Sequence, residues 1–272
     1  MLSPAQIQEF RSNGLLVVPD VVPERLRANV IDAIIEFSNI SLDDKATWYQ
    51  PTFSGHGIVP LHHHQALWDV RQLPLLHEIF AEIYNTEKLW VSMDRVSYKP
   101  PASAAISNWS ESAVHWDCDP WRISGLSLQG LVYLTDTGED QGAFACVPSI
   151  FQSIKDYREK HQNDENRNQP VFEDNDLIPV GGKAGSLVLW NRLMPHTSHL
   201  NFSDQHRFVQ YVSMQPDSSS GSERQQRINE WQTKAPPEWA IRQRISHQLI
   251  PEPGAPASLT TLGEKLVGVT TW

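Results

Sequence analysis

Several features that define other classes of protein are scarce or missing in this chain of 272 residues. It has only two cysteines, Cys118 and Cys146, which are too few for a disulfide framework. It has no run of about 18 apolar residues that could span a membrane. The first residues, Met1 to Gln6, also lack the basic and apolar regions of a signal peptide. We therefore expect a soluble, cytoplasmic protein.

Positive charge is also scarce. The chain has 22 Lys and Arg residues against 32 Asp and Glu residues, which gives a formal net charge of −10. No block of the sequence is rich in Lys and Arg, whereas a nucleic-acid or anionic-membrane surface needs clustered cations. We expect a small-molecule substrate, with no nucleic-acid or membrane partner. The sequence leaves the oligomeric state open.

The order of the expected elements indicates one domain over residues 1–272. Helical patterns dominate residues 1–88, short strands with turns fill residues 89–215, and residues 216–272 form a C-terminal extension. Helices followed by many short strands favour a mainly β protein with flanking helices, in which N-terminal helices wrap a sandwich or barrel.

A short motif indicates metal chemistry. His115 and Asp117 form an H-x-D pair, and on a strand two such residues project to the same face. With His196 far downstream, they supply the two histidines and one carboxylate that hold non-haem Fe(II). Asp119 is an alternative carboxylate, but Pro120 disturbs its strand geometry.

The segment after His196 adds a longer pattern. Ser198 follows His196 by two residues, and Arg207 follows it by eleven. With the H-x-D pair, this pattern resembles the phytanoyl-CoA dioxygenase (PhyH-like) family of Fe(II)/2-oxoglutarate oxygenases. The resemblance covers residues from about 4 to 215. It includes the Pro-x-Gln-x-x-x-Phe-x-x-x-Gly entry at residues 4–14, Tyr98-Lys99-Pro100-Pro101, and Gln141-Gly142-Ala143-Phe144.

The resemblance implies a double-stranded β-helix, also called a jelly roll or cupin-like fold. It implies that His115, Asp117 and His196 bind Fe(II), with 2-oxoglutarate as cosubstrate and O₂ as oxidant. Arg207 would then pair with the distant carboxylate of 2-oxoglutarate, since guanidinium binds carboxylate bidentately.

Two hydroxyl groups would assist in binding 2-oxoglutarate. Ser198 can add one hydrogen bond, and Tyr133 another. The alignment near Tyr133 is ambiguous, and Gln129 or Leu131 could take its place. His199 is a nearby competitor for the role of iron ligand, but only His196 gives the family's spacing to Arg207.

The implied activity is oxidation of a small molecule or secondary metabolite, with release of succinate and CO₂. Hydroxylation is expected, with dealkylation or desaturation as further outcomes, because Asp117 occupies the place that related halogenases leave to chloride. The alternatives are a cupin-like metalloenzyme that does not use 2-oxoglutarate and a non-catalytic binding module. Arg207 and Ser198 disfavour the first, and the intact triad disfavours the second.

The sequence says less about substrate contacts. The irregular segments 41–68 and 102–112 are expected to shape the pocket, since binding residues are often found on loops of a rigid scaffold. Trp121 is either a core residue or a wall of the pocket. Arg192 could reach an acidic group of the substrate or lie in solvent.

Overall fold

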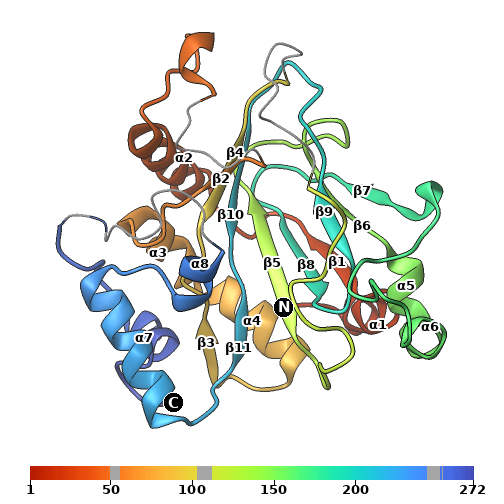
Figure 1. Ribbon diagram of the computed structural model, residues 1–272. Helices are drawn as coiled ribbons and strands as arrows, with labels where there is room; N and C mark the ends of the chain where they lie inside the picture. The colour runs from red at the N-terminus through yellow and green to blue at the C-terminus, as the bar shows by residue number, and fades with distance from the viewer. Residues whose placement is uncertain (50–55, 103–111, 244–251, 253) are drawn as a thin grey trace.

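The computed structural model describes residues 1–49, 56–102, 112–243, 252 and 254–272. At its centre lies an antiparallel six-stranded sheet (Figure 1). Its strands, in spatial order, are β1 (Leu15–Val18), β8 (Leu187–Asn191), β5 (Leu128–Tyr133), β10 (Arg207–Tyr211), β4 (Val96–Lys99) and β2 (Ile58–Val59).

A second antiparallel sheet faces one side of the first. It consists of β7 (Ile178–Val180), β6 (Phe144–Cys146) and β9 (His196–Ser198). A separate pair joins β11 (Met214–Pro216) to β3 (Leu89–Val91). Buried side chains from both facing sheets form a common cluster, which includes Tyr133, Trp190, Val209, Phe144 and Cys146. This apolar layer between the sheets is the environment of the candidate site.

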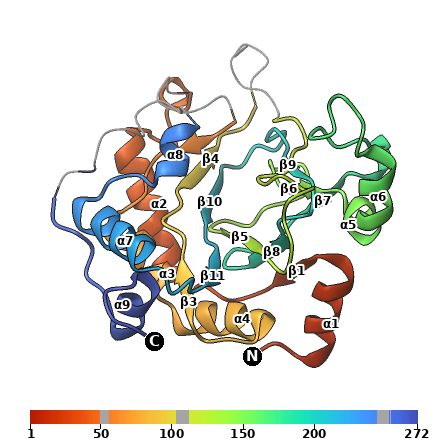
Figure 2. The ribbon, with the colours of Figure 1, turned by 60° about the horizontal axis from the view of Figure 1, so that its bottom comes forward.

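Helices cover the opposite face of the six-stranded sheet and its edges (Figures 1 and 2). The N-terminal half contributes α1 (Pro4–Asn13), α2 (Glu24–Ser38), α3 (Gln65–Arg71), α4 (Pro74–Tyr84) and the 3₁₀ turn η1 (Lys45–Thr47). The later part contributes α5 (Pro148–Gln152), α6 (Ile154–His161), η2 (Asp174–Asp176), α7 (Gly221–Thr233), α8 (Glu238–Arg242) and α9 (Thr261–Val267). Within the described part of the chain, no helix has the length and apolar character needed to cross a membrane.

The N-terminal region contributes a strand as well as helices. Helix α1 begins at the capping box of Ser3 and ends at Gly14, whose φ of +69° favours glycine. Leu15–Val18 then pairs along its whole length with β8, so this region contributes an edge strand to the main sheet. The four apolar residues are enough for this pairing. Their partner strand lies about 170 residues further along the chain.

Candidate active site

Three side chains meet between the two sheets. Within the described ranges, His115, Asp117 and His196 are the one group of histidine, cysteine and acidic residues that could hold a metal ion, with ligand atoms within 4.8 Å of one another. Asp117 lies between the histidines: its Oδ1 is 3.5 Å from His115 Nε2, and its Oδ2 is 3.4 Å from His196 Nε2. Two imidazoles and one carboxylate suit a divalent transition metal such as iron.

The backbone fixes which nitrogen of each histidine is available. His115 Nδ1 lies 2.8 Å from the carbonyl oxygen of Ala113, and His196 Nδ1 lies 3.1 Å from that of Met194. A carbonyl oxygen can only accept, so each Nδ1 donates its proton to the backbone and each Nε2 faces Asp117, where it would bind a metal once deprotonated. This is the arrangement that metal-binding histidines adopt. The donor set therefore fits a bound iron.

The segment that carries His115 and Asp117 differs from the expected strand. It forms one isolated bridge, in which the backbone groups of His115 and His196 exchange hydrogen bonds of 3.0 Å in both directions. After Asp117 the chain turns, and the Asp119 carboxylate accepts from the Trp121 N–H at 2.9 Å. Pro120 has no N–H to continue a ladder, so the strand prediction was wrong, although the two side chains still converge.

Several groups orient the Asp117 carboxylate. Gln129 Nε2 donates to Asp117 Oδ2 at 2.7 Å, and Arg192 Nη2 donates to the Asp117 backbone carbonyl at 2.7 Å. Burial raises the pKa of Asp117, but hydrogen bonds from His115, His196 and Gln129 outweigh this effect and hold the pKa well below its usual range. Asp117 is therefore an ionised ligand held in one orientation.

Arg207 is a buried cation on the same inner surface. Its side chain is 0% exposed, and its Nη1 donates to Ser97 Oγ at 2.8 Å. Among the described residues, its Nε and Nη2 atoms have no hydrogen-bond partner. Since unpaired buried donors are costly, this guanidinium is suited to receive an anion from outside the chain.

The two predicted hydroxyl groups lie in different surroundings. Ser198 ends β9, and its Oγ accepts from Lys99 Nζ at 2.9 Å. Tyr133 donates its hydroxyl proton to the Val180 carbonyl at 2.6 Å and accepts from the Phe144 N–H at 3.0 Å. The Tyr133 ring lies 5.9 Å from the guanidinium carbon of Arg207. Tyr133 would have to release Val180 before it could donate to a ligand.

The remaining candidates lie around the metal group. Trp121 packs edge-on against Trp116, with 6.0 Å between ring centroids, and Arg167 lies 5.2 Å from its ring. Arg192 is held by the backbone of Asp117, as described above. Among the described residues, neither Asp119 nor His199 joins the metal-binding group. The expected pocket segments 41–68 and 102–112 fall partly outside the described ranges.

Sequence reasoning missed one buried cation near the site. The backbone carbonyl of Arg95 accepts from the Tyr211 N–H at 3.1 Å, which extends the β4–β10 ladder by one residue. By alternation it shares the inner face of β4 with Ser97, and it is 6% exposed. Trp239 of α8 covers its guanidinium at 5.2 Å. Only the alternation of residues 95, 97 and 99 could have indicated this position.

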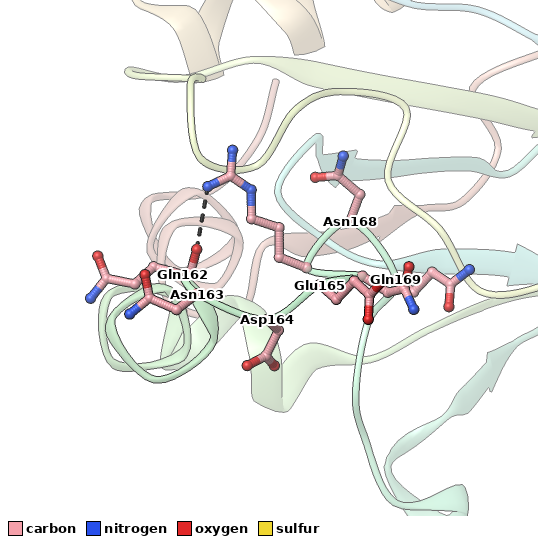
Figure 3. Close-up of a pocket in the computed structure, with 8 residues that line it drawn as sticks. Gln162, Asn163, Asp164, Glu165, Asn168 and Gln169 are labelled. Atoms are coloured by element: carbon pink, nitrogen blue, oxygen red, sulfur yellow. Dashed lines mark hydrogen bonds between the residues drawn. The ribbon is translucent and has the colours of Figure 1, made fainter.

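A surface hollow beside α6 is not the site. It is lined by residues 162–169, which belong to one polar loop after α6 (Figure 3), and Arg167 Nη1 donates to the Gln162 carbonyl at 3.4 Å. The residues of the metal group do not line it. The location of the site therefore rests on its chemistry rather than on surface shape.

Comparison with known proteins agrees with this geometry. The family model described as phytanoyl-CoA dioxygenase (PhyH) matches residues 10–209. A relative from Aspergillus versicolor, Ava biosynthesis cluster protein O, is 25% identical over 242 residues, covering 76% of each chain.

Solved structures share the fold at low identity. The hypothetical protein JW0805 from Escherichia coli has a TM-score of 0.71 and 14% identity, and the match covers 98% of this chain and 82% of that one. SnoK, a non-haem α-ketoglutarate-dependent carbocyclase from nogalamycin biosynthesis, has a TM-score of 0.52 and 21% identity, with 81% and 89% covered.

Proposed function

The chain belongs to the phytanoyl-CoA dioxygenase family, and from this premise we propose that it is an Fe(II)- and 2-oxoglutarate-dependent oxygenase acting on a small molecule. One observation carries the proposal: an iron-compatible group of His115, Asp117 and His196 lies between the same two sheets as Arg207, a buried cation with two unpartnered donors. A metal group alone would fit many enzymes, whereas the added cation calls for an anionic cosubstrate.

Each residue has a role in this proposal. The Nε2 atoms of His115 and His196 and the Asp117 carboxylate would hold Fe(II), and Arg207 would pair with the far carboxylate of 2-oxoglutarate. Ser198 is the hydroxyl group proposed to assist Arg207. When bound, iron with 2-oxoglutarate and O₂ supplies the oxidising power: one oxygen atom enters the substrate, and the other enters succinate as CO₂ is released.

The chain itself orients these groups. The carbonyls of Ala113 and Met194 fix the histidine tautomers, and Gln129 fixes the carboxylate. The apolar cluster between the sheets contacts both groups: the Tyr133 ring lies 5.9 Å from Arg207, and the rings of Phe144 and Trp190 pack against His196. Groups held in advance in the binding geometry need no reorganisation when the ligands arrive.

The proposal extends to the fold, the location in the cell and the reaction product. We interpret the facing sheets as a double-stranded β-helix within one domain over residues 1–272, acting in the cytoplasm. Hydroxylation is the proposed outcome, with dealkylation or desaturation open to the same substrate radical. Two relatives are named for biosynthesis, of a fungal cluster and of nogalamycin, which supports a secondary metabolite as substrate.

The test combines binding with turnover. Anaerobic titration should show that the protein binds Fe(II) and then 2-oxoglutarate, and O₂ consumption over metabolite pools should identify the substrate. His196→Ala should lose iron, whereas His199→Ala serves as the matched control and should retain it. A wild-type protein that binds iron but not 2-oxoglutarate would point to another metalloenzyme; one that binds neither would be a binding module.

A further inference from the structure

Lys99 is a buried lysine that connects the two sheets beside Arg207. It is 1% exposed, and it lies directly opposite Arg207 in the β4–β10 pairing. Its ammonium group crosses to the smaller sheet at the end of β9. There it donates to Ser198 Oγ at 2.9 Å, to the Ser198 carbonyl at 3.0 Å, and to the His199 carbonyl.

This contact determines what Ser198 can offer. An ammonium group only donates, so the Ser198 hydroxyl oxygen must accept from Lys99. The hydroxyl has one proton of its own, which is therefore directed to another acceptor. Lys99 thus presents Ser198 as a hydrogen-bond donor and fixes the distance between the ends of β9 and β4.

Lys99 also adds charge. Directly opposite residues of an antiparallel pair have Cβ atoms about 4.5–5.5 Å apart, so the side chains of Lys99 and Arg207 start from neighbouring positions on one face. Two buried cationic side chains that start from neighbouring positions raise the local potential and favour a ligand with a full negative charge. A neutral group at the same place would leave that potential uncompensated.

The surroundings hold the lysine in place. A Cβ added at Gly142 would lie 2.9 Å from Lys99 Cδ and 3.3 Å from the His199 carbonyl, and Gly142 has a φ of +69°. Asn201 Nδ2 donates to the Lys99 carbonyl at 3.0 Å. A glycine is therefore required where the lysine stem passes, which indicates that the path across the sheets is specific.

We propose that Lys99 is a positioning residue that orients Ser198 and adds charge beside Arg207, so that the site selects a 2-oxo acid with a second carboxylate at its far end. This inference rests on the proposed function. It assigns the discrimination between dicarboxylate and monocarboxylate cosubstrates to Lys99 together with Arg207, rather than to Arg207 alone.

The experiment compares two ligands by anaerobic calorimetry on the Fe(II)-loaded protein. The ligands are 2-oxoglutarate and 2-oxopentanoate, which has the same chain length but no far carboxylate. Loss of a charge-assisted contact should weaken 2-oxoglutarate binding to Lys99→Met about tenfold or more, while 2-oxopentanoate binding stays nearly unchanged. Equal weakening of both ligands, as a general structural defect would produce, would overturn the inference.

A double-mutant cycle tests whether Lys99 acts through Ser198. If it does, Lys99→Met together with Ser198→Ala should weaken 2-oxoglutarate binding by less than the product of the two single effects. Independent, multiplying effects would contradict positioning. Should Lys99→Met not fold, Lys99→Gln, which keeps a donor but lacks the charge, replaces it in both measurements.

The outcomes separate this inference from the proposed function. If the wild-type protein binds no 2-oxoglutarate, the proposed function fails. If the wild type prefers 2-oxoglutarate, Arg207→Met loses the preference and the Lys99 variant keeps it, only the inference about Lys99 fails.

Discussion

Gln129 links Asp117 to the main sheet. Its side-chain nitrogen donates to Asp117 Oδ2 at 2.7 Å, while its side-chain oxygen accepts from Trp190 Nε1 at 3.2 Å. Gln129 and Trp190 are directly opposite each other on β5 and β8. An indole N–H can only donate, so the amide cannot turn over without losing both contacts. The orientation of the carboxylate is thus set by two neighbouring strands of the large sheet.

Replacing Gln129 should therefore weaken metal binding without removing a ligand. We expect Gln129→Leu to lower the affinity for Fe(II) by about 10–100-fold, the usual cost of losing a group that orients a ligand. Trp190→Phe, which keeps a ring but not the N–H, should shift affinity in the same direction by less. Anaerobic iron titration measures both; an unchanged affinity in Gln129→Leu would show that the amide does not orient the carboxylate.

Arg207→Met should separate cosubstrate binding from iron binding. Losing one partner of a buried charged pair costs about 2–5 kcal/mol, which should appear as a higher 2-oxoglutarate requirement. Arg207 is not part of the metal group, so iron affinity should stay close to that of the wild type. Titrating both ligands in one variant provides the internal control, and an unchanged 2-oxoglutarate affinity would remove the role assigned to Arg207.

Local patterns in the sequence predicted much of the framework. The capping residues of α1 and the apolar run of β5 are local features that adjacent residues encode. The H-x-D pair and His196 could also be expected to meet, because a metal requires it. Their proximity is present in the structure, although the local segment is a bridge rather than a strand.

Contacts between distant strands could not be predicted in the same way. Gln129 was considered only as an alternative to Tyr133, yet its role depends on pairing between β5 and β8. Lys99 similarly acquires its role from the register with Arg207 and the approach of β9. Such relations depend on which strands become neighbours, and no spacing along the chain specifies that.

Two buried histidines outside the site should make the protein sensitive to acid. Burial, with nearby Arg71, lowers the pKa of His62 and of His63 from 6.5 to about 3. Below pH 6.5 the unfolded chain binds protons that the folded chain excludes, so the free energy of unfolding falls as pH falls. The loss at pH 5 should be about 2 kcal/mol for each histidine.

Denaturant unfolding between about pH 7.5 and pH 5 measures this effect, because the histidine pKa of the unfolded chain, about 6.5, lies between these limits. In His62→Gln the pH dependence should become shallower, because one of the two groups no longer titrates. His64→Gln changes an exposed neighbour and serves as the control. A slope in His62→Gln as steep as in the wild type would mean that His62 is not excluded from protonation by burial.

The carboxylate at position 117 determines which product we expect. A halogenase of this type needs an open metal position for chloride, and a small residue in place of the carboxylate provides it. Here Asp117 lies between His115 and His196, is held by Gln129, and has a pKa well below its usual range, so chloride would have to displace an ionised and oriented carboxylate. The substrate should therefore gain oxygen rather than chlorine.

Turnover under ¹⁸O₂ in chloride-rich buffer, analysed by product mass, should give a labelled oxygen in the product or in its expelled fragment, and no chlorinated species. A chlorinated product from the wild-type protein would show that Asp117 does not bind the metal during turnover.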